Sequence, residues 1–303
     1  MHGAIHSLGL RLFQSSFRGL CLLPFCVSSS LAGVDICRQP APYSYLSIAF
    51  SRQQASSIEP DIGEIDQENS RFDLQFQLRN DWSFGAGHRY TILNVDPLQP
   101  QTNGHLHTYF LALHKQRRSD NSSVRFSIAP ALSASSNVAK KPREYKADAL
   151  QVLAALIWSR QPSGRTKLWY GVCGDHRFGS YQIYPSVGIE IEPANDWTIE
   201  LGFPASQLTR RLSRNLASAI RIRPDGNEWY VKDESLEKQS RVVYEAWSLE
   251  WDIVWQAHEH LMITAGVGRQ FRNRFELTLL DDSRARFRSD PATRFSAAVA
   301  WRF

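Results

Sequence analysis

Apolar and polar residues alternate along many short stretches of this chain. In residues 71–79 the even positions are apolar, and the odd positions carry charged or amide side chains. The same period of two recurs in residues 46–50, 124–128, 150–158, 187–191, 197–203 and 247–255. Because successive side chains of a β-strand point to opposite faces, each stretch predicts a strand with one apolar and one polar face.

The connections between these stretches alternate between short and long. Short polar turns are expected near residues 80–81, 119–122, 162–165, 193–196, 224–227 and 257–259. Longer loops are expected at residues 53–70, 93–104, 131–147, 174–181, 204–215, 232–240 and 272–292. Short turns on one side and longer loops on the other are typical of an outer-membrane barrel. The pattern predicts an all-β antiparallel transmembrane barrel of 14 strands, or 12 if residues 217–223 and 228–231 fold elsewhere.

Trp follows a similar polar turn three times, in the sequences RNDW, ANDW and GNEW. An indole at a membrane rim buries its ring and keeps its N–H near water. In the predicted topology the interface aromatics at one rim are Trp82, Trp197, Trp229, Trp255, Trp301 and Phe303. A soluble barrel that packs Trp against its turns is the alternative.

The first 32 residues read as a signal peptide, with early Arg residues, a short apolar run at 20–27 and a small-x-small site ending at Ala32. A buried N-terminal strand or helix is the alternative. Residues 33–42 then form a periplasmic segment and residues 43–303 form the barrel. The mature chain would carry a formal charge of 33 − 30 = +3, against 35 − 30 = +5 for the whole chain. This excess is too small to indicate nucleic-acid binding.

The last strand ends on an aromatic residue. Residues 295–303 alternate strictly, with Phe295, Ala297, Val299, Trp301 and Phe303 on one face. This ending resembles the signal that the bacterial barrel-assembly machinery reads, so that machinery and outer-membrane lipid are the expected partners. The expected location is the outer membrane of a Gram-negative cell.

Three further segments carry a family resemblance. They are RFGSYQIYPSVGIEIEPANDWTIELGFPASQL at 177–208, GNEWYV at 226–231 and AVAWRF at the end of the chain. Together they resemble an uncharacterised family of Gram-negative outer-membrane β-barrel proteins, carried as a domain of unknown function. The resemblance implies a barrel and its location, and it implies no catalytic residues.

The cysteines of the mature chain and several histidines are candidate sites. Cys37 and Cys173 fall on opposite sides of the membrane in the predicted topology, so no disulfide is expected between them. His105 and His107 share a strand face, but zinc needs a third ligand, and His88 or His114 would have to be brought near. Water-facing imidazoles are the simpler interpretation, and the 258–260 group is expected to be exposed in a turn. Residues 173–176 contain Cys, Asp and His, but their order matches no local sequence motif of a catalytic cysteine. We predict no enzyme activity, metal or cofactor.

The inward faces carry charges of both signs. The predicted lumen charges are Arg71, Asp73, Arg79, Arg125, Glu190, Glu192, Glu200, Arg221, Arg223, Glu250 and Asp252. Ion pairs between neighbouring strands, such as Glu200 with Arg221, would brace a narrow interior, and a charge ladder that guides solutes is the alternative. The predicted function is an outer-membrane barrel of unknown specific role or a narrow passive channel for a small solute. The alternatives are a closed barrel acting through its outer loops, or an outer-membrane enzyme with an outward Ser/His pair.

Overall fold

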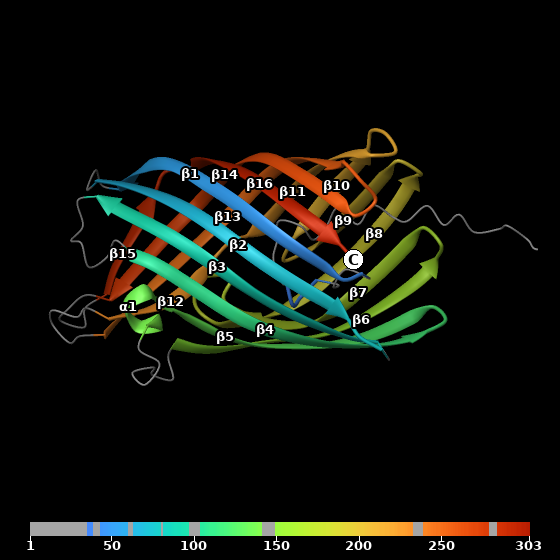
Figure 1. Ribbon diagram of the computed structural model, residues 1–303, viewed down its shortest axis with the longest axis horizontal. Helices are drawn as coiled ribbons and strands as arrows, with labels where there is room; N and C mark the ends of the chain where they lie inside the picture. Colours follow the sequence, from blue (N-terminus) through green and yellow to red (C-terminus); the bar gives the residue numbers. More distant parts are fainter. Residues whose placement is uncertain are drawn as a thin grey trace, which may run out of the picture.

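The computed structural model describes residues 35–38, 43–59, 63–79, 81–96, 104–140, 149–232, 239–278 and 284–303. Within these ranges the chain forms one closed β-barrel (Figure 1). The expected signal peptide and its cleavage site near Ala32 lie outside the described residues. No helix in these ranges is long and apolar enough to cross a membrane.

The described residues form long strands and one short helix. In chain order they are β1 (Tyr45–Glu59), β2 (Gly63–Gln77), β3 (Trp82–Asp96), β4 (Gly104–Ser119), β5 (Ser122–Ser135), α1 (Ser136–Ala139), β6 (Leu150–Ser163), β7 (Thr166–Asp175), β8 (Gln182–Ala194), β9 (Trp197–Phe203), β10 (Ser206–Arg211), β11 (Leu216–Pro224), β12 (Asn227–Lys232), β13 (Gln239–Gln256), β14 (Leu261–Thr278), β15 (Arg284–Ser289) and β16 (Ala292–Arg302).

These strands occupy fourteen positions around the barrel wall, which is the strand number that the sequence predicts. β11 and β12 both pair with β13 and share one position, and β15 and β16 share another between β14 and β1. The wall closes where β16 meets β1, with Val299 opposite Ile48. The last residues of β2, β4, β6, β8, β10 and β13 lie with the C-terminus at one end of the barrel, called the turn end. The opposite end, which carries α1, β12 and β15, is called the loop end.

Two predicted connections are wrong, although the strand number is right. The expected loop at 204–215 contains β10, and the expected turn at 224–227 is only an interruption between β11 and β12. The sequence Pro224-Asp225-Gly226 has turn-forming composition. However, Arg221, Asp225 and Asn227 are all buried at alternate positions, so the strand alternation continues through the interruption.

The expected loop at 53–70 is also largely strand. β1 and β2 approach each other as far as Glu59 and Gly63. Their loop-end residues are polar on the outward face, so they lack the apolar half of the alternating signal that marks a strand crossing lipid. Strand pairing continues there because backbone hydrogen bonds do not require an apolar face.

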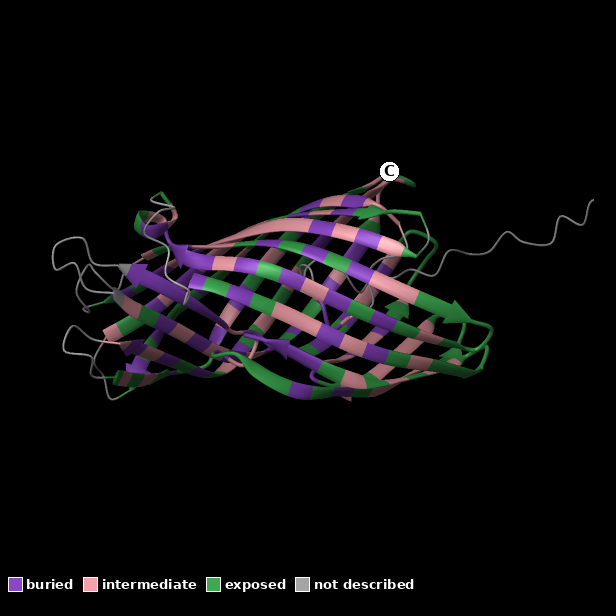
Figure 2. Cartoon of the chain, turned by 90° about the horizontal axis from the view of Figure 1, so that it is seen from below, coloured by how far each residue is buried: buried purple, intermediate pink, exposed green. Residues whose placement is uncertain are grey.

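Exposed apolar side chains surround the wall. They reach 74 % exposure at Ile183, whereas inward side chains are buried, as at Asp252 with 0 % exposure. Figure 2 shows buried and exposed positions alternating along the strands. Large exposed apolar residues occur on β1, β2, β4, β5, β6, β7, β8, β9, β11, β13, β14 and β16. A soluble barrel or sandwich would turn these faces inward, so this arrangement fits a barrel surrounded by lipid.

An apolar core fills the barrel at the loop end. Its buried members come from strands on several sides of the wall: Ile58, Ile65, Leu93, Val95, Leu106, Trp229, Val231, Val242, Tyr244, Ala246, Phe275 and Leu277. The outer edge of β12 also pairs with β5 in parallel, with Tyr230 opposite Ala134. This pairing joins two strands that have β6–β10 between them elsewhere in the wall, so the barrel narrows at the loop end.

Candidate functional site: the barrel interior

A short N-terminal segment, Asp35–Arg38, lies inside the barrel. Ile36 is 1 % exposed and packs with Ala129, Ala155 and other inward residues of the wall. The Arg125 guanidinium on β5 donates a hydrogen bond of 2.9 Å to the Cys37 carbonyl oxygen. These four residues belong to the stretch that the sequence assigns to the periplasm, and the structure places them within the lumen instead.

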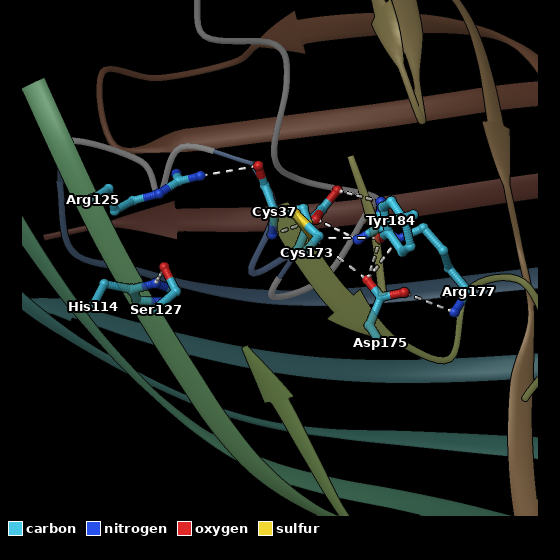
Figure 3. Close-up of a disulfide and its surroundings, with 9 residues drawn as sticks. Cys37, His114, Arg125, Ser127, Cys173, Asp175, Arg177 and Tyr184 are labelled. Atoms are coloured by element: carbon cyan, nitrogen blue, oxygen red, sulfur yellow. Dashed lines mark hydrogen bonds and ion pairs between the residues drawn. A yellow bond between two sulfur atoms is a disulfide. The ribbon is translucent and has the colours of Figure 1, made fainter. Parts of the chain in front are cut away.

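The prediction that Cys37 and Cys173 stay unbonded is wrong. They form a disulfide with their Cα atoms 5.8 Å apart (Figure 3). The prediction assumed that the N-terminal segment remains outside the wall. Because the segment enters the lumen, Cys37 reaches the inward face of β7, where Cys173 is 1 % exposed.

Ion pairs hold the same segment on both sides of the disulfide. Arg177, in the connection after β7, binds Asp35 at 3.2 Å through Nη1 and Asp175 at 2.7 Å through Nε. Tyr184 donates a hydrogen bond of 2.7 Å to Asp175. Burial raises the pKa of Asp35, but the charge and hydrogen bonds of Arg177 outweigh it, so the net pKa is lowered. Asp35 is therefore an anion at neutral pH.

Arg38 continues this attachment on another part of the wall. Its guanidinium forms an ion pair with Glu200 on β9 and lies 3.4 Å from the Gln207 side-chain oxygen on β10. The expected pair between Glu200 and Arg221 is absent from the described residues, because β10 lies between their strands and Gln207 stands opposite both. Arg221 instead binds Asp252 on β13.

Most of the other expected lumen charges lie inside the barrel as oppositely charged pairs. Arg71 binds Asp73 at 2.8 Å, Arg221 binds Asp252 at 3.0 Å, and Arg223 binds Glu250 at 3.2 Å. Glu190 is half-buried on β8. Glu192 and Arg79 are exposed near the turn end, so these two do not line the interior. The paired arrangement favours bracing of the interior over an unpaired charge ladder.

Asp225 is the central acid of the interior, although its sequence context predicts a turn. Arg294 and Arg89 both form ion pairs with it, and Gln270 donates a hydrogen bond of 3.1 Å. Its position two residues after Arg223 continues the inward alternation, which is the signal that would have revealed it. A cavity of about 170 Å³ lies beside these groups, lined by residues that include Asp35, Arg71, Arg177 and Asp225.

The expected interface aromatics divide into two groups. Trp255, Trp301 and Phe303 are exposed at the turn end, and Trp82 and Trp197 are half-buried beside turns there. Trp229 contradicts the prediction, because it is 1 % exposed within the apolar core at the loop end. It follows an interruption within one wall strand rather than a turn, so it lies far along that strand from the turn end.

The histidines considered as metal ligands lie on both faces of the wall. His114 points inward, is 3 % exposed and lies 2.8 Å from the Ser127 hydroxyl (Figure 3). His88, on β3, comes within 3.0 Å of His107 on the outward face. The described residues contain no group of three or more His, Cys, Asp and Glu side chains arranged to hold a metal ion. In the 258–260 group, His258 and Glu259 are exposed as expected, whereas His260 is half-buried and lies 3.1 Å from the Arg302 carbonyl oxygen.

Comparison with known proteins gives similarity at the level of architecture. No protein-family model matches the chain, and no curated protein matches it in sequence. An outer membrane channel from Pseudomonas putida F1 is 7 % identical with a TM-score of 0.46, over 90 % of this chain and 100 % of that one. A Pseudomonas aeruginosa FadL homologue is 10 % identical with a TM-score of 0.45, over 85 % and 89 %. The NanC porin is 6 % identical with a TM-score of 0.43, over 85 % and 100 %. The barrel assignment rests on the strand pairing of this chain itself.

Proposed function

We propose that this protein is a closed outer-membrane barrel that works at its outer surface rather than as an open pore. The observation that carries the proposal is the apolar core at the loop end. All of its side chains are buried, and Leu93, Trp229 and Phe275 are 3 % exposed or less. A water-filled path between these side chains would leave them accessible, so their burial supports a closed interior.

The attached N-terminal segment supports the same interpretation. It occupies the lumen near Cys173 and is held by a disulfide and by ion pairs to Arg177 and Glu200. Paired charges fill much of the remaining interior, as with Arg221 and Asp252. A solute would have to displace both the segment and the apolar core to cross the barrel.

The proposal includes a location and an orientation. Removal of the signal peptide near Ala32 would deliver the chain to the periplasm, and Phe303 would be read by the barrel-assembly machinery. The turn end would then face the periplasm and the loop end the outside, as in barrels with short periplasmic turns.

Single-channel conductance of refolded residues 33–303 in a planar bilayer tests the closed interior. Protein whose folding is shown by its heat-dependent mobility in gel electrophoresis is expected to give no current steps. Reproducible steps from such protein would overturn the proposal.

A narrow passive channel is the second candidate, and the cavity of about 170 Å³ is the observation that favours it. If steps occur, their reversal potential in a salt gradient identifies the charge that governs permeation. A rise in conductance after Cys37→Ser substitution would indicate that the N-terminal segment limits the flow. Silence in both proteins would support the closed barrel.

A further inference from the structure

Histidines and tyrosines form a stacked group on the outward face of β3 and β4. Tyr90 is opposite His107 in the strand register, and His88 is opposite Tyr109. The ring centroids are 4.9 Å apart in the first pair and 4.4 Å apart in the second. His107 has the same parity along β4 as Leu111, which is 54 % exposed, so the group faces away from the lumen.

Ser136, the first residue of α1, meets this group. Its hydroxyl lies 2.8 Å from His107 Nε2 and 3.3 Å from the His105 carbonyl oxygen. The second ring nitrogen of His107, Nδ1, lies 3.0 Å from His88 Nε2. The three side chains therefore form a continuous line of hydrogen bonds from a hydroxyl through one imidazole to a second.

This line has the geometry of an activated nucleophile. For His107 Nε2 to accept the Ser136 proton, its Nδ1 must carry a hydrogen and donate it to His88. His88 then holds its own hydrogen on Nδ1. A hydroxyl, a base in hydrogen-bond reach and a third group that orients the base are the parts that nucleophilic catalysis requires.

The support around Ser136 fixes its position. Val138 on α1 is 2 % exposed and packs with Ala134, Ala149 and Tyr230. This anchor attaches the helix to the barrel, while Ser136 and His107 remain half-buried and open to the outside. Lys140, directly after α1, is exposed and gives this part of the surface a positive charge.

The group lies where apolar surface gives way to charge. On the neighbouring β2, the outward residues Phe72 and Phe76 are exposed apolar side chains, whereas Glu68 is charged and faces outward toward the loop end. In register, His88 is opposite Phe72 and Tyr90 is opposite Ser70. Tyr is enriched at the interface between apolar chains and head groups, and that is also the depth at which the ester carbonyls of lipids lie.

We propose that Ser136 and His107, positioned by His88, hydrolyse an acyl ester of a lipid in the outer leaflet. The inference rests on the proposed function, because it is the chemistry that such an outward surface would perform. The outward Ser/His pair that the sequence did not reveal comes from separate elements, with Ser136 on α1, His107 on β4 and His88 on β3.

The reaction balances with water as the only co-reactant. Ser136 Oγ forms a bond to the ester carbonyl carbon while its proton passes to His107 Nε2. The bond from that carbon to the alcohol oxygen then breaks, and the leaving oxygen takes the proton from His107. Water attacks the acyl-serine, gives a proton to His107, and releases the carboxylic acid as the proton returns to Ser136 Oγ.

Turnover of a long-chain p-nitrophenyl ester by refolded residues 33–303 in detergent micelles tests the site. Ser136→Ala and His107→Ala are each expected to lower kcat by at least about 10³-fold. Ser70→Ala is the matched control, because Ser70 is an outward serine of β2 that lies opposite Tyr90 of the same aromatic group, and the rate of this variant is expected to equal the wild-type rate. Activity that survives Ser136→Ala would overturn the proposal.

Two further measurements separate catalysis from a structural role. A fluorophosphonate is expected to label Ser136 in wild-type protein, identified by peptide mass, and to label His107→Ala much less. His88→Ala is expected to lower kcat with little change in KM, and His88→Gln to restore part of it because the amide oxygen can accept the His107 hydrogen bond. Equal rates for His88→Ala and wild type would contradict the positioning role.

Comparison of two lipid substrates identifies the class of lipid that the protein hydrolyses. Vesicles of diacyl phospholipid and dispersed lipopolysaccharide both offer acyl esters, and release of fatty acid from one of them identifies the natural class. Folded wild-type protein that neither turns over any of the three substrates nor reacts with the fluorophosphonate would overturn the inference. Conductance is measured separately, so an open pore with intact hydrolysis would reject only the closed interior.

Discussion

Cys37 is bonded to Cys173 of β7, so the N-terminal segment is covalently attached to the wall that surrounds it. The two residues are 136 positions apart in the sequence. A cross-link over such a separation restricts the unfolded chain strongly. The bond therefore connects the stability of the barrel with the location of the segment inside it.

Cys173→Ser is expected to lower the free energy of unfolding by about 2–5 kcal/mol, because it releases the closed loop in the unfolded chain. Urea titration of refolded protein in detergent, followed by Trp fluorescence, measures the change. The Cys37→Ser/Cys173→Ser double variant is the control and should lose about the same amount, since both variants remove the same bond. A reductant without effect on wild-type stability would contradict the prediction.

The pair of Asp35 and Arg177 predicts a change in acid stability. The pKa of Asp35 is lowered in the folded protein, so its contribution is fully present above the ordinary value of about 3.9 and is lost as pH falls through the folded value. The stability difference between wild type and Asp35→Asn should therefore be constant from about pH 7 to pH 5 and shrink in stronger acid. Unfolding titrations of both proteins at pH 7, 5 and 3 measure it, and other acids cancel in the difference. A difference that grows toward acid would refute it.

The sequence predicts the wall better than the interior. Alternation in stretches such as 71–79 identifies which face meets lipid. The predicted strand number is right because two errors offset each other: β10 lies in an expected loop, and β11 and β12, expected as separate strands, share one position in the wall. The alternation does not identify which side chains contact each other inside the barrel. Asp225 and Trp229 follow turn-like residues, and only the register of β11 and β12 on β13 shows that both lie within a wall strand.

The outward site was missed for a related reason. His105 and His107 were recognisable as neighbours on one strand face, whereas Ser136 comes from a stretch expected to be a loop. Its contact with His107 depends on the pairing of β4 with β5, which brings His107 opposite Ala134. Residues that meet through strand pairing have no fixed separation in the sequence, so no local motif predicts their contact.

Removing one member of the buried Arg221–Asp252 pair is expected to lower the free energy of unfolding strongly, whereas replacing both members by apolar residues is expected to lower it much less. The two side chains are 2 % and 0 % exposed, so Arg221→Met would leave an uncompensated buried carboxylate. The expected cost is about 3–5 kcal/mol, whereas an Arg221→Met/Asp252→Leu double variant should cost much less. Urea titration of the three proteins measures the coupling.

The matched control for that pair is Arg52 with Glu68, on the outward surface. Their side chains are 72 % and 43 % exposed, so Arg52→Met is expected to cost at most about 1 kcal/mol. Equal losses for Arg52→Met and Arg221→Met would contradict the assignment of Arg221 to the packed interior.

Quenching by brominated phospholipids should distinguish the outward Trp residues from the one in the core. Trp251 is 51 % exposed on the outward face of β13, whereas Trp229 is 1 % exposed inside the loop end. Bromine quenches indoles that it contacts, so Trp251→Phe removes a quenched emitter and should lower the quenched fraction of fluorescence. Trp229→Phe removes an unquenched emitter and should raise that fraction. Refolding each variant into vesicles with and without brominated chains provides the measurement. A lower quenched fraction in Trp229→Phe would place that indole against lipid and contradict the core at the loop end, on which the proposal of a closed barrel depends.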